Sequence, residues 1–261
     1  MSKLTAQSRF DVSGKSFLIT GATGTLGSEA ARALSAAGAN LTLAGGNAER
    51  LKELAAELPR SSVRVQRRPE SAHDAAAMVA EAEDAFGRLD GVLTAAGMNK
   101  VSPIVDMPLE DFETVMDANV RGSWLTCQAV GRRLLEQGTG GSVVLVSSTR
   151  GKLGHPAGYS AYSPSKAAVD VLAKTLAAEW GPHGIRVNAL APTVFRSELT
   201  AWMYEDDEVG TATREAMLSR IPLGRLAEPE DFVGALIYLL SDASAFLTGQ
   251  VLYLDGGYTA C

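Results

Sequence analysis

Short apolar runs alternate with helix-forming segments along the whole chain of 261 residues. The runs cover residues 17–19, 41–44, 63–65, 89–97, 143–146, 185–192 and 251–254. A helix after each strand is the usual way to connect parallel strands, so this alternation favours a parallel, doubly wound α/β sheet. In such sheets ligands bind beyond the carboxyl ends of the strands. We therefore look for functional residues just after each apolar run.

Length and composition indicate one α/β domain over residues 1–261. A hydrophobic content of 46% is enough for a large core. The segment 1–12 is predicted to be an N-terminal tail. The mixed segment 193–220, acidic in its middle, is predicted to be a mobile flap over the substrate.

Charge and cysteine content exclude several classes of protein. A net charge of -6 without a long basic run argues against a nucleic-acid partner. No apolar run reaches the ~18 residues of a membrane span, and the N-terminus lacks the apolar core of a signal peptide. Cys127 and Cys261 have no metal-like or disulfide-like spacing, so we expect no metal site and a cytoplasmic location.

A glycine-rich turn follows the first apolar run and opens a helix. Its glycines are Gly21, Gly24 and Gly27. Glycine lets the backbone approach a diphosphate closely, and the helix N-terminus offers free N–H groups to its charge. A plain tight turn would use the same residues, but the position between strand and helix favours a dinucleotide site.

The loop after the second run lies where a nucleotide-binding sheet contacts the adenosine ribose. Residues 45–47 provide neither the carboxylate that binds the 2′-hydroxyl of NAD nor an arginine for the 2′-phosphate of NADP. The nearest basic residues are Arg50, Arg67 and Arg68. With no carboxylate to repel a phosphate, the sequence favours NADP(H). The alternative, that Arg67 and Arg68 are solvated surface charges, stays open.

Three residues near the fifth run suit proton transfer. Tyr162 and Lys166 lie four residues apart in a predicted helix, so their side chains share one face. A nearby cation lowers the pKa of a phenol from its usual value of about 10. Ser148 follows the strand and could hydrogen-bond a substrate oxygen. The group suits reduction of a carbonyl, although the tyrosine could also simply pack on a neighbouring helix.

A long helix is predicted over residues 109–137, with Asn119 in its interior. Asparagine is an indifferent helix former, so we expect a local interruption of the helical hydrogen bonds there. A capped kink without a functional role is the alternative.

These motifs together resemble the short-chain dehydrogenase/reductases, over nearly the whole chain. The family's Tyr-x-x-x-Lys motif matches Tyr162 and Lys166, its catalytic serine matches Ser148, and its helix asparagine matches Asn119. The resemblance implies a Rossmann-type sheet of about seven strands and a homotetramer built from the Tyr162 helix region and the C-terminal segment. It implies that Tyr162 is the general acid/base, that Ser148 orients the carbonyl and that Lys166 binds the nicotinamide ribose and lowers the tyrosine pKa. Asn119 would hold a water in a proton relay.

The resemblance also implies the residues that bind NAD(P)(H). They are Gly21, Thr23, Thr25, Leu26, Gly27, Gly45, Arg68, Ala96, Gly97, Tyr162, Lys166, Pro192 and Phe195.

Four departures from the family pattern concern the cofactor rather than catalysis. In the first turn the middle glycine, Gly24, stands one place early. Residues 94–97 are Thr-Ala-Ala-Gly where Asn-Asn-Ala-Gly is usual, and the aspartate that often contacts adenine falls at about Arg68. Pro192 is followed by Thr193 instead of glycine.

Substrate recognition has three candidates near these motifs: Arg150, His155 and Arg196. We expect them to bind an anionic or polyhydroxylated substrate. The prediction is an oxidoreductase that interconverts a secondary alcohol and a ketone, acting on a small polar polyol, sugar acid or hydroxy/keto acid. The segment from 221 to 257 looks most like polyol and gluconate-type dehydrogenases. The alternatives are an enzyme like the 3-oxoacyl-carrier-protein reductases and a non-catalytic dinucleotide-binding protein.

Overall fold

Seven parallel strands form one sheet in the order β3-β2-β1-β4-β5-β6-β7. This is a computed structural model, and it describes residues 5–205 and 207–261. The strands are β1 (Ser16–Thr20), β2 (Asn40–Ala44), β3 (Ser62–Val65), β4 (Gly91–Thr94), β5 (Gly141–Val146), β6 (Ile185–Pro192) and β7 (Val251–Leu254). The chain runs outwards from β1 to β3 and then returns to place β4 on the other side of β1. The strand order therefore reverses between β1 and β4, which is where such sheets bind ligands. The prediction of a doubly wound sheet of about seven strands in a single domain is confirmed.

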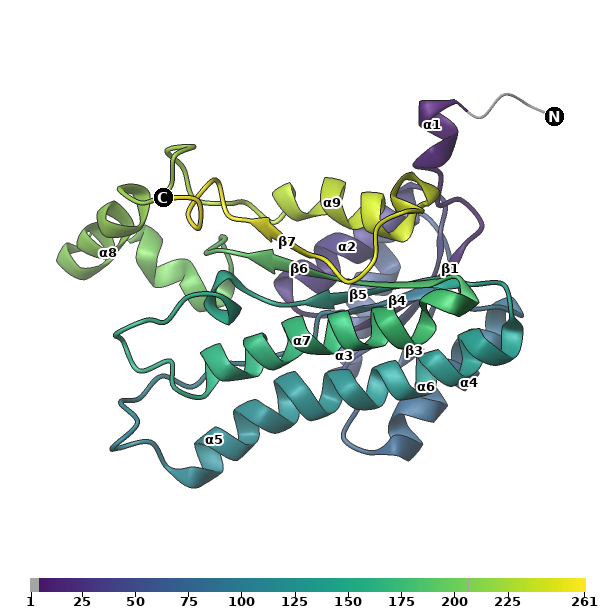
Figure 1. The fold of residues 1–261 in the computed structure, drawn as a ribbon, viewed down its shortest axis with the longest axis horizontal. Helices are drawn as coiled ribbons and strands as arrows, with labels where there is room; N and C mark the ends of the chain where they lie inside the picture. The colour runs from purple at the N-terminus through teal and green to yellow at the C-terminus, as the bar shows by residue number, and fades with distance from the viewer. Residues whose placement is uncertain (1–4, 206) are drawn as a thin grey trace.

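Helices cover both faces of the sheet (Figure 1). On one face lie α2 (Thr25–Ala36) and α9 (Asp231–Leu240), and on the other α4 (Ala72–Phe86), α6 (Gly122–Gln137) and α7 (Tyr162–Trp180). Each face has its own apolar core, and α3 (Ala48–Glu57) contributes to the one under α2 and α9. Because both faces are buried, the strands are apolar on both sides, which is why they were recognisable as continuous runs.

The long helix predicted over 109–137 is interrupted as expected. It consists of α5 (Leu109–Met116), a π-helical turn at Asp117–Arg121 and α6. Asn119 is in the π-helical turn and is buried. π-Helical turns inside α-helices are rare and occur frequently at functional sites.

The segments predicted as tail and flap contain short helices. Residues 5–12 include α1 (Ala6–Arg9). The segment 193–220 contains a 3-10 helix (Glu198–Tyr204) and α8 (Glu208–Leu218), and α8 lies beside the C-terminus in Figure 1. Further 3-10 turns are at Thr149–Gly151, Gly181–His183 and Asp242–Ser244. Within the described residues, no helix has the length and apolar character needed to cross a membrane.

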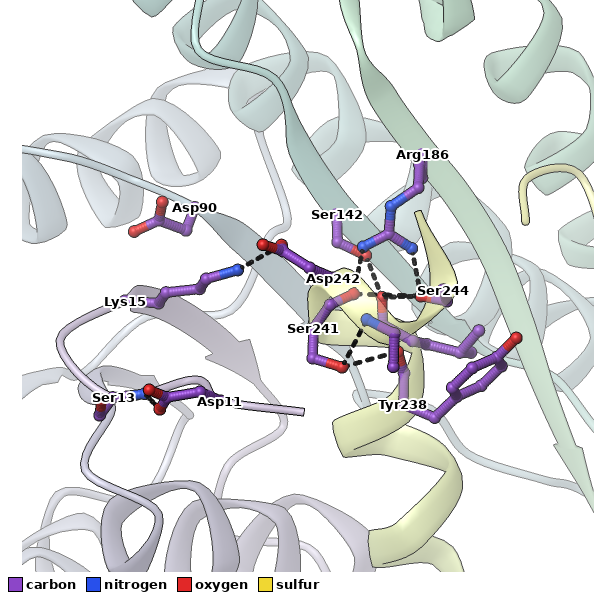
Figure 2. A network of polar contacts seen from close by, with 12 residues as sticks. Asp11, Ser13, Lys15, Asp90, Ser142, Arg186, Tyr238, Ser241, Asp242 and Ser244 are labelled. Carbon is purple, nitrogen blue, oxygen red and sulfur yellow. Dashed lines mark hydrogen bonds and ion pairs between the residues drawn. The ribbon is translucent and has the colours of Figure 1, made fainter. Parts of the chain in front are cut away.

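The amino ends of β5 and β6 are tied to the end of α9 by polar contacts (Figure 2). The Ser142 hydroxyl donates to the Leu239 carbonyl at 2.7 Å. The Arg186 guanidinium donates to the Ser244 hydroxyl at 2.6 Å and to the Ser241 carbonyl at 3.1 Å. This network braces the edge of the sheet that is opposite to the carboxyl ends of the strands.

Candidate active site

A cleft of about 750 Å³ opens at the carboxyl ends of the strands, around the point where the strand order reverses. It is lined by the residues that follow the first four strands and by the π-helical turn. The lining includes Gly21, Thr23, Gly45, Arg68, Ala96 and Gly97, six of the predicted cofactor residues. The volume is within the usual range for a site that takes a small molecule or cofactor.

The glycine-rich turn approaches the end of β4 too closely for side chains. A Cβ on Gly21 would lie 2.5 Å from the Ala96 nitrogen, and one on Gly27 would lie 2.2 Å from the Gly21 carbonyl oxygen. A Cβ on Gly24 would be 3.4 Å from the same oxygen, which is an ordinary contact. The close approach therefore depends on the two outer glycines, so the shifted middle glycine leaves it intact.

The N-terminus of α2 is open for an anion. Gly24 caps this helix without a side-chain hydrogen bond, so the helix begins at Thr25 with unfilled N–H groups. Such an end, together with a turn stripped of side chains, fits the diphosphate of a dinucleotide. Thr25, Leu26 and Gly27 form the first turn of this helix.

At the far end of the cleft, Arg68 lies against Gly46. A Cβ on Gly46 would lie 2.4 Å from Arg68 Nε, so the guanidinium occupies the space that a side chain would fill. Arg67 forms an ion pair with Asp74 at 2.8 Å. In the described part of the chain Arg68 has no ion pair. Of the two adjacent arginines, Arg68 is thus the one whose guanidinium can form an ion pair with a ligand.

Asn119 holds the loop after β4. Its Oδ1 accepts a hydrogen bond from the Met98 N–H at 2.8 Å, and its Nδ2 donates to the Met98 carbonyl at 2.9 Å. Nδ2 also donates to the Ser165 hydroxyl at 2.9 Å, which links the π-helical turn to α7. A Cβ on Gly97 would lie 3.0 Å from Asn119 Oδ1, so the loop packs directly on the amide.

Ser148, Tyr162 and Lys166 come together at the end of β5. Ser148 follows this strand and lies close enough to the Tyr162 phenol to lower its pKa. Lys166 lies one turn further along α7, with Nζ 5.6 Å from the centre of the Tyr162 ring. Lys166 Nζ also donates to the Val146 carbonyl at 2.9 Å, which anchors the lysine to the strand that carries Ser148.

Burial dominates the acid–base properties of this group. It raises the pKa of the Tyr162 phenol above its ordinary value, whereas Ser148 and the charge of Arg150 lower it. Burial also lowers the pKa of Lys166 to about 8, with Asp170 acting in the opposite direction. At neutral pH Tyr162 therefore keeps its proton and can donate it. The cation that lowers the Tyr162 pKa in this arrangement is Arg150.

Two of the three substrate candidates lie near Tyr162. Arg150 is buried, and its backbone N–H donates to the Ser148 hydroxyl at 3.1 Å. His155 packs edge-on against Tyr159, whose ring centre is 6.0 Å from that of Tyr162. Burial, followed by the charges of Arg150 and Arg220, lowers the pKa of His155, so it is neutral at pH 7.

The third substrate candidate has other partners. The Arg196 guanidinium lies 4.0 Å from the centre of the Tyr204 ring, and its Nε is 3.6 Å from a Glu228 carboxylate oxygen. Its side chain is largely exposed. Pro192 is the last residue of β6, and Phe195 forms an isolated bridge with Ala227 shortly after it.

Several residues at the site were not found from the sequence. Ser165 was seen only as a variable position of the Tyr-x-x-x-Lys motif, although a hydroxyl at that position is a possible signal. At Gly46 the sequence shows only that no carboxylate is present. Tyr258 contacts Arg150, and Arg220 contacts Tyr258, but both are far from Arg150 in the chain and no sequence signal connects them.

Known proteins resemble this chain over nearly its full length. A family model described as enoyl-(acyl carrier protein) reductase matches residues 21–259. An uncharacterized oxidoreductase of Mycobacterium tuberculosis is 70% identical over 97% of this chain and 94% of its own. D-threitol dehydrogenase of Mycolicibacterium smegmatis is 37% identical over 96% and 95% of the two chains.

Solved structures also resemble this chain over nearly its full length. A short-chain type dehydrogenase/reductase from Mycobacterium marinum has a TM-score of 0.91 at 34% identity, covering 98% of this chain and 100% of its own. A gluconate 5-dehydrogenase from Burkholderia cenocepacia, in complex with NADP and tartrate, has a TM-score of 0.91 at 30% identity, with the same coverage.

Proposed function

This chain belongs to the short-chain dehydrogenase/reductase family, and we propose that it is an NAD(P)-dependent enzyme that interconverts a secondary alcohol and a ketone. The observation that supports this most is the meeting of Ser148, Tyr162 and Lys166 at the end of β5, next to a cleft suited to a dinucleotide.

The proposed roles follow from the chemistry of each side chain. The bound nicotinamide cofactor would supply or accept the hydride at the carbinol carbon. During reduction Ser148 donates a hydrogen bond to the carbonyl oxygen, and Tyr162 transfers its proton to that oxygen. During alcohol oxidation the Tyr162 phenolate takes this proton back. Lys166 would bind the nicotinamide ribose, whereas the charge of Arg150 is the one that lowers the Tyr162 pKa and so favours the phenolate. Asn119 holds a water that relays protons.

We propose NADP(H) as the preferred cofactor. Arg68 lies against Gly46 without an ion pair in the described residues, at the loop that follows β2. A guanidinium there can form charge-assisted hydrogen bonds with the 2′-phosphate of NADP. Arg50 lies near the same loop, but it forms an ion pair with Glu198 at 3.5 Å.

For the substrate, we propose a small polar polyol, sugar acid or hydroxy/keto acid. The names of two relatives support this class, since they act on threitol and gluconate. The buried cation Arg150 next to Ser148 supports a polar or anionic substrate.

A second candidate is an enzyme like the 3-oxoacyl-carrier-protein reductases. The description of the matching family model, which names an acyl carrier protein, favours it. An acidic carrier protein would need a basic surface, whereas this chain has a net charge of -6. The third interpretation, a dinucleotide-binding protein without turnover, would not need Ser148, Tyr162 and Lys166 together.

The test combines cofactor binding with turnover. NADPH and NADH are titrated separately into the purified protein and followed by fluorescence, and their consumption is then followed with polar ketones, keto acids and 3-oxoacyl thioesters. We expect tighter binding of NADPH and turnover of the polar ketones or keto acids. Turnover of thioesters alone would support the second candidate. Cofactor binding without turnover of any substrate would support the binding protein.

We also propose that the protein is a homotetramer. Large apolar side chains are exposed on the helix pair α6 and α7 and before β7: Trp124 is 48% exposed, Val171 58% and Phe246 fully exposed. Exposed apolar surface of this kind is typical of protein–protein contacts. Light scattering coupled to size-exclusion chromatography tests this proposal, and a monomeric mass would contradict it.

A further inference from the structure

We propose that Arg150 and Arg220, which both contact the ring of Tyr258, form a binding site for a carboxylate of the substrate. The inference rests on the proposed function and narrows its substrate class from polar alcohols in general to hydroxy acids and keto acids. Arg220 and Tyr258 would then be specificity-determining residues for the same reaction.

Both arginines contact Tyr258. Arg150 Nη2 donates to the Tyr258 hydroxyl at 3.3 Å, and its Cζ lies 5.6 Å from the centre of the Tyr258 ring. The Arg220 Cζ lies 4.2 Å from the same ring centre. Tyr258 is buried, so it holds both guanidinium groups in defined positions. Arg150 also lies 5.8 Å from the ring centre of Tyr159.

The positive charge of this cluster is not balanced by a carboxylate. In the described residues neither Arg150 nor Arg220 has an ion pair. Asp255, the acid nearest to Tyr258 along the chain, already accepts hydrogen bonds from the backbone N–H groups of Gly257 and Thr259, at 3.0 and 2.8 Å. A buried arginine normally has an acidic partner, because an isolated charge is costly to bury. Here the missing partner is best supplied by a ligand.

Arg150 has hydrogen-bonding capacity left for that ligand. Its side chain makes two long hydrogen bonds to neutral oxygens, one to Tyr258 and one to the Gly154 carbonyl at 3.4 Å. A guanidinium has five N–H donors, and its planar fork matches a carboxylate with two parallel hydrogen bonds.

The position of the cluster determines which carboxylates fit. Arg150 is two residues from Ser148, which orients the reacting carbonyl, and its charge acts on both Tyr162 and His155. The carboxylate must therefore be close to the reacting carbon in the same small molecule. A short hydroxy acid has this arrangement, as does an aldonate that reacts next to its carboxylate, whereas a neutral polyol lacks the anion.

The first test measures binding without turnover, with two probes of the same carbon skeleton: tartrate, which has two carboxylates, and threitol, which has none. Thermal unfolding is recorded with and without each probe for the wild type, Arg220→Gln and Arg150→Lys. We expect tartrate to raise the midpoint of the wild type more than threitol does, and Arg220→Gln to abolish the difference. Arg88→Gln, at the opposite edge of the sheet, is the matched control and should retain it.

The second test compares turnover of gluconate with that of the matching neutral hexitol. We expect Arg220→Gln to lower kcat/KM for gluconate at least tenfold and to leave that for the hexitol within twofold. Arg150→Lys keeps the charge but not the planar fork, so it should also lower gluconate turnover. Because Arg220 is exposed, its variant tests the inference even if Arg150→Lys fails to fold.

The outcomes separate the two proposals. Equal losses for acid and hexitol in Arg220→Gln, or equal stabilisation of the wild type by tartrate and threitol, would overturn the carboxylate site while leaving the oxidoreductase intact. Stabilisation by tartrate that depends on Arg220, without turnover of any alcohol or ketone, would support the anion site and contradict the proposed function.

Discussion

Asn119 and Ser165 are joined by a buried hydrogen bond of 2.9 Å between the π-helical turn and α7. The Ser165 hydroxyl donates in turn to the Tyr162 carbonyl at 2.7 Å. The asparagine amide also holds both backbone groups of Met98. The first residue of α7, the π-helical turn and the loop after β4 are therefore connected through two side chains.

Replacing Ser165 with alanine should weaken this connection. The change leaves one N–H of the buried Asn119 amide without its partner, so we expect the free energy of unfolding to fall by about 1–3 kcal/mol. We expect kcat to fall severalfold, because Tyr162 and Asn119 lose a shared restraint, while cofactor affinity changes little. Urea unfolding and steady-state kinetics measure both effects.

The same helix provides the control for Ser165→Ala. The Ser163 hydroxyl is buried and has no hydrogen-bond partner in the described residues. Ser163→Ala should thus be neutral or slightly stabilising, and kcat should stay at the wild-type value. Equal losses of stability and kcat in the two variants would show that the Asn119–Ser165 contact has no special role.

Replacing Arg68 with alanine should change cofactor preference. We expect the Kd for NADPH to rise about 10- to 100-fold, the equivalent of losing one or two charge-assisted hydrogen bonds, with the Kd for NADH within threefold of the wild type. Gly46→Ala should act in the same direction, because its Cβ would meet Arg68 Nε at 2.4 Å and displace the guanidinium. Arg67→Ala should have a smaller effect, because Arg67 is paired with Asp74. A parallel loss of NADH and NADPH binding in Arg68→Ala would contradict the assignment.

Lys166 should make stability depend on pH. Its pKa is about 8 in the folded protein, against an ordinary value of 10.5 for a lysine side chain. Between these values the unfolded chain binds more protons than the folded one, so the free energy of unfolding rises with pH by up to about 1.4 kcal/mol per pH unit from this group. Below pH 8 both states are protonated and the contribution is constant.

The Lys166 effect is isolated by comparison with Lys166→Met. The stability of the wild type relative to this variant should increase from pH 8 to pH 10, as measured by urea unfolding at each pH. Other groups titrate in both proteins and cancel in the difference. A difference that stays constant over this range would show that the Lys166 pKa is not lowered.

The strands and their parallel arrangement could be predicted because burial of both sheet faces makes each strand a continuous apolar run. The interruption at Asn119 was also predictable, since asparagine is an indifferent helix former and stands inside a long helical pattern. The start of α9 at Asp231 could not be predicted, because the Asp231 carboxylate accepts a hydrogen bond from the Glu228 N–H at 2.9 Å and pairs with Arg225. Such contacts depend on side-chain geometry, which cannot be predicted from the spacing of apolar residues.

Contacts between segments that are distant in the chain could not be predicted from the sequence. Arg150 and Tyr258 are separated by 108 positions, so their hydrogen bond has no local signal. The contact of Gly46 with Arg68 is similar, because it needs β2 and β3 to be paired in register. The motif residues Ser148, Tyr162 and Lys166 were predictable because the family pattern records their spacing. The residues that surround these three could not be predicted, because the family pattern does not include them.

The network at the opposite edge of the sheet should affect stability and not catalysis. Arg186→Ala removes hydrogen bonds to Ser244 and Ser241 (Figure 2), so we expect the free energy of unfolding to fall by about 1–3 kcal/mol with KM and kcat unchanged. Arg60→Ala, an exposed arginine with a single 3.5 Å contact to Asn40, should change stability by less than about 0.5 kcal/mol. A large change in kcat for Arg186→Ala would contradict a purely structural role.

The central claim is that Tyr162 transfers the proton, and Tyr162→Phe tests it most directly. The change removes one hydroxyl and keeps the ring, so fold and cofactor binding should persist. In a single-turnover experiment, the variant loaded with the preferred cofactor is mixed with a ketone substrate of the wild type. We predict that the rate of reduction falls about 10²- to 10⁴-fold with cofactor affinity unchanged. A rate within a few-fold of the wild type would contradict the proposed mechanism.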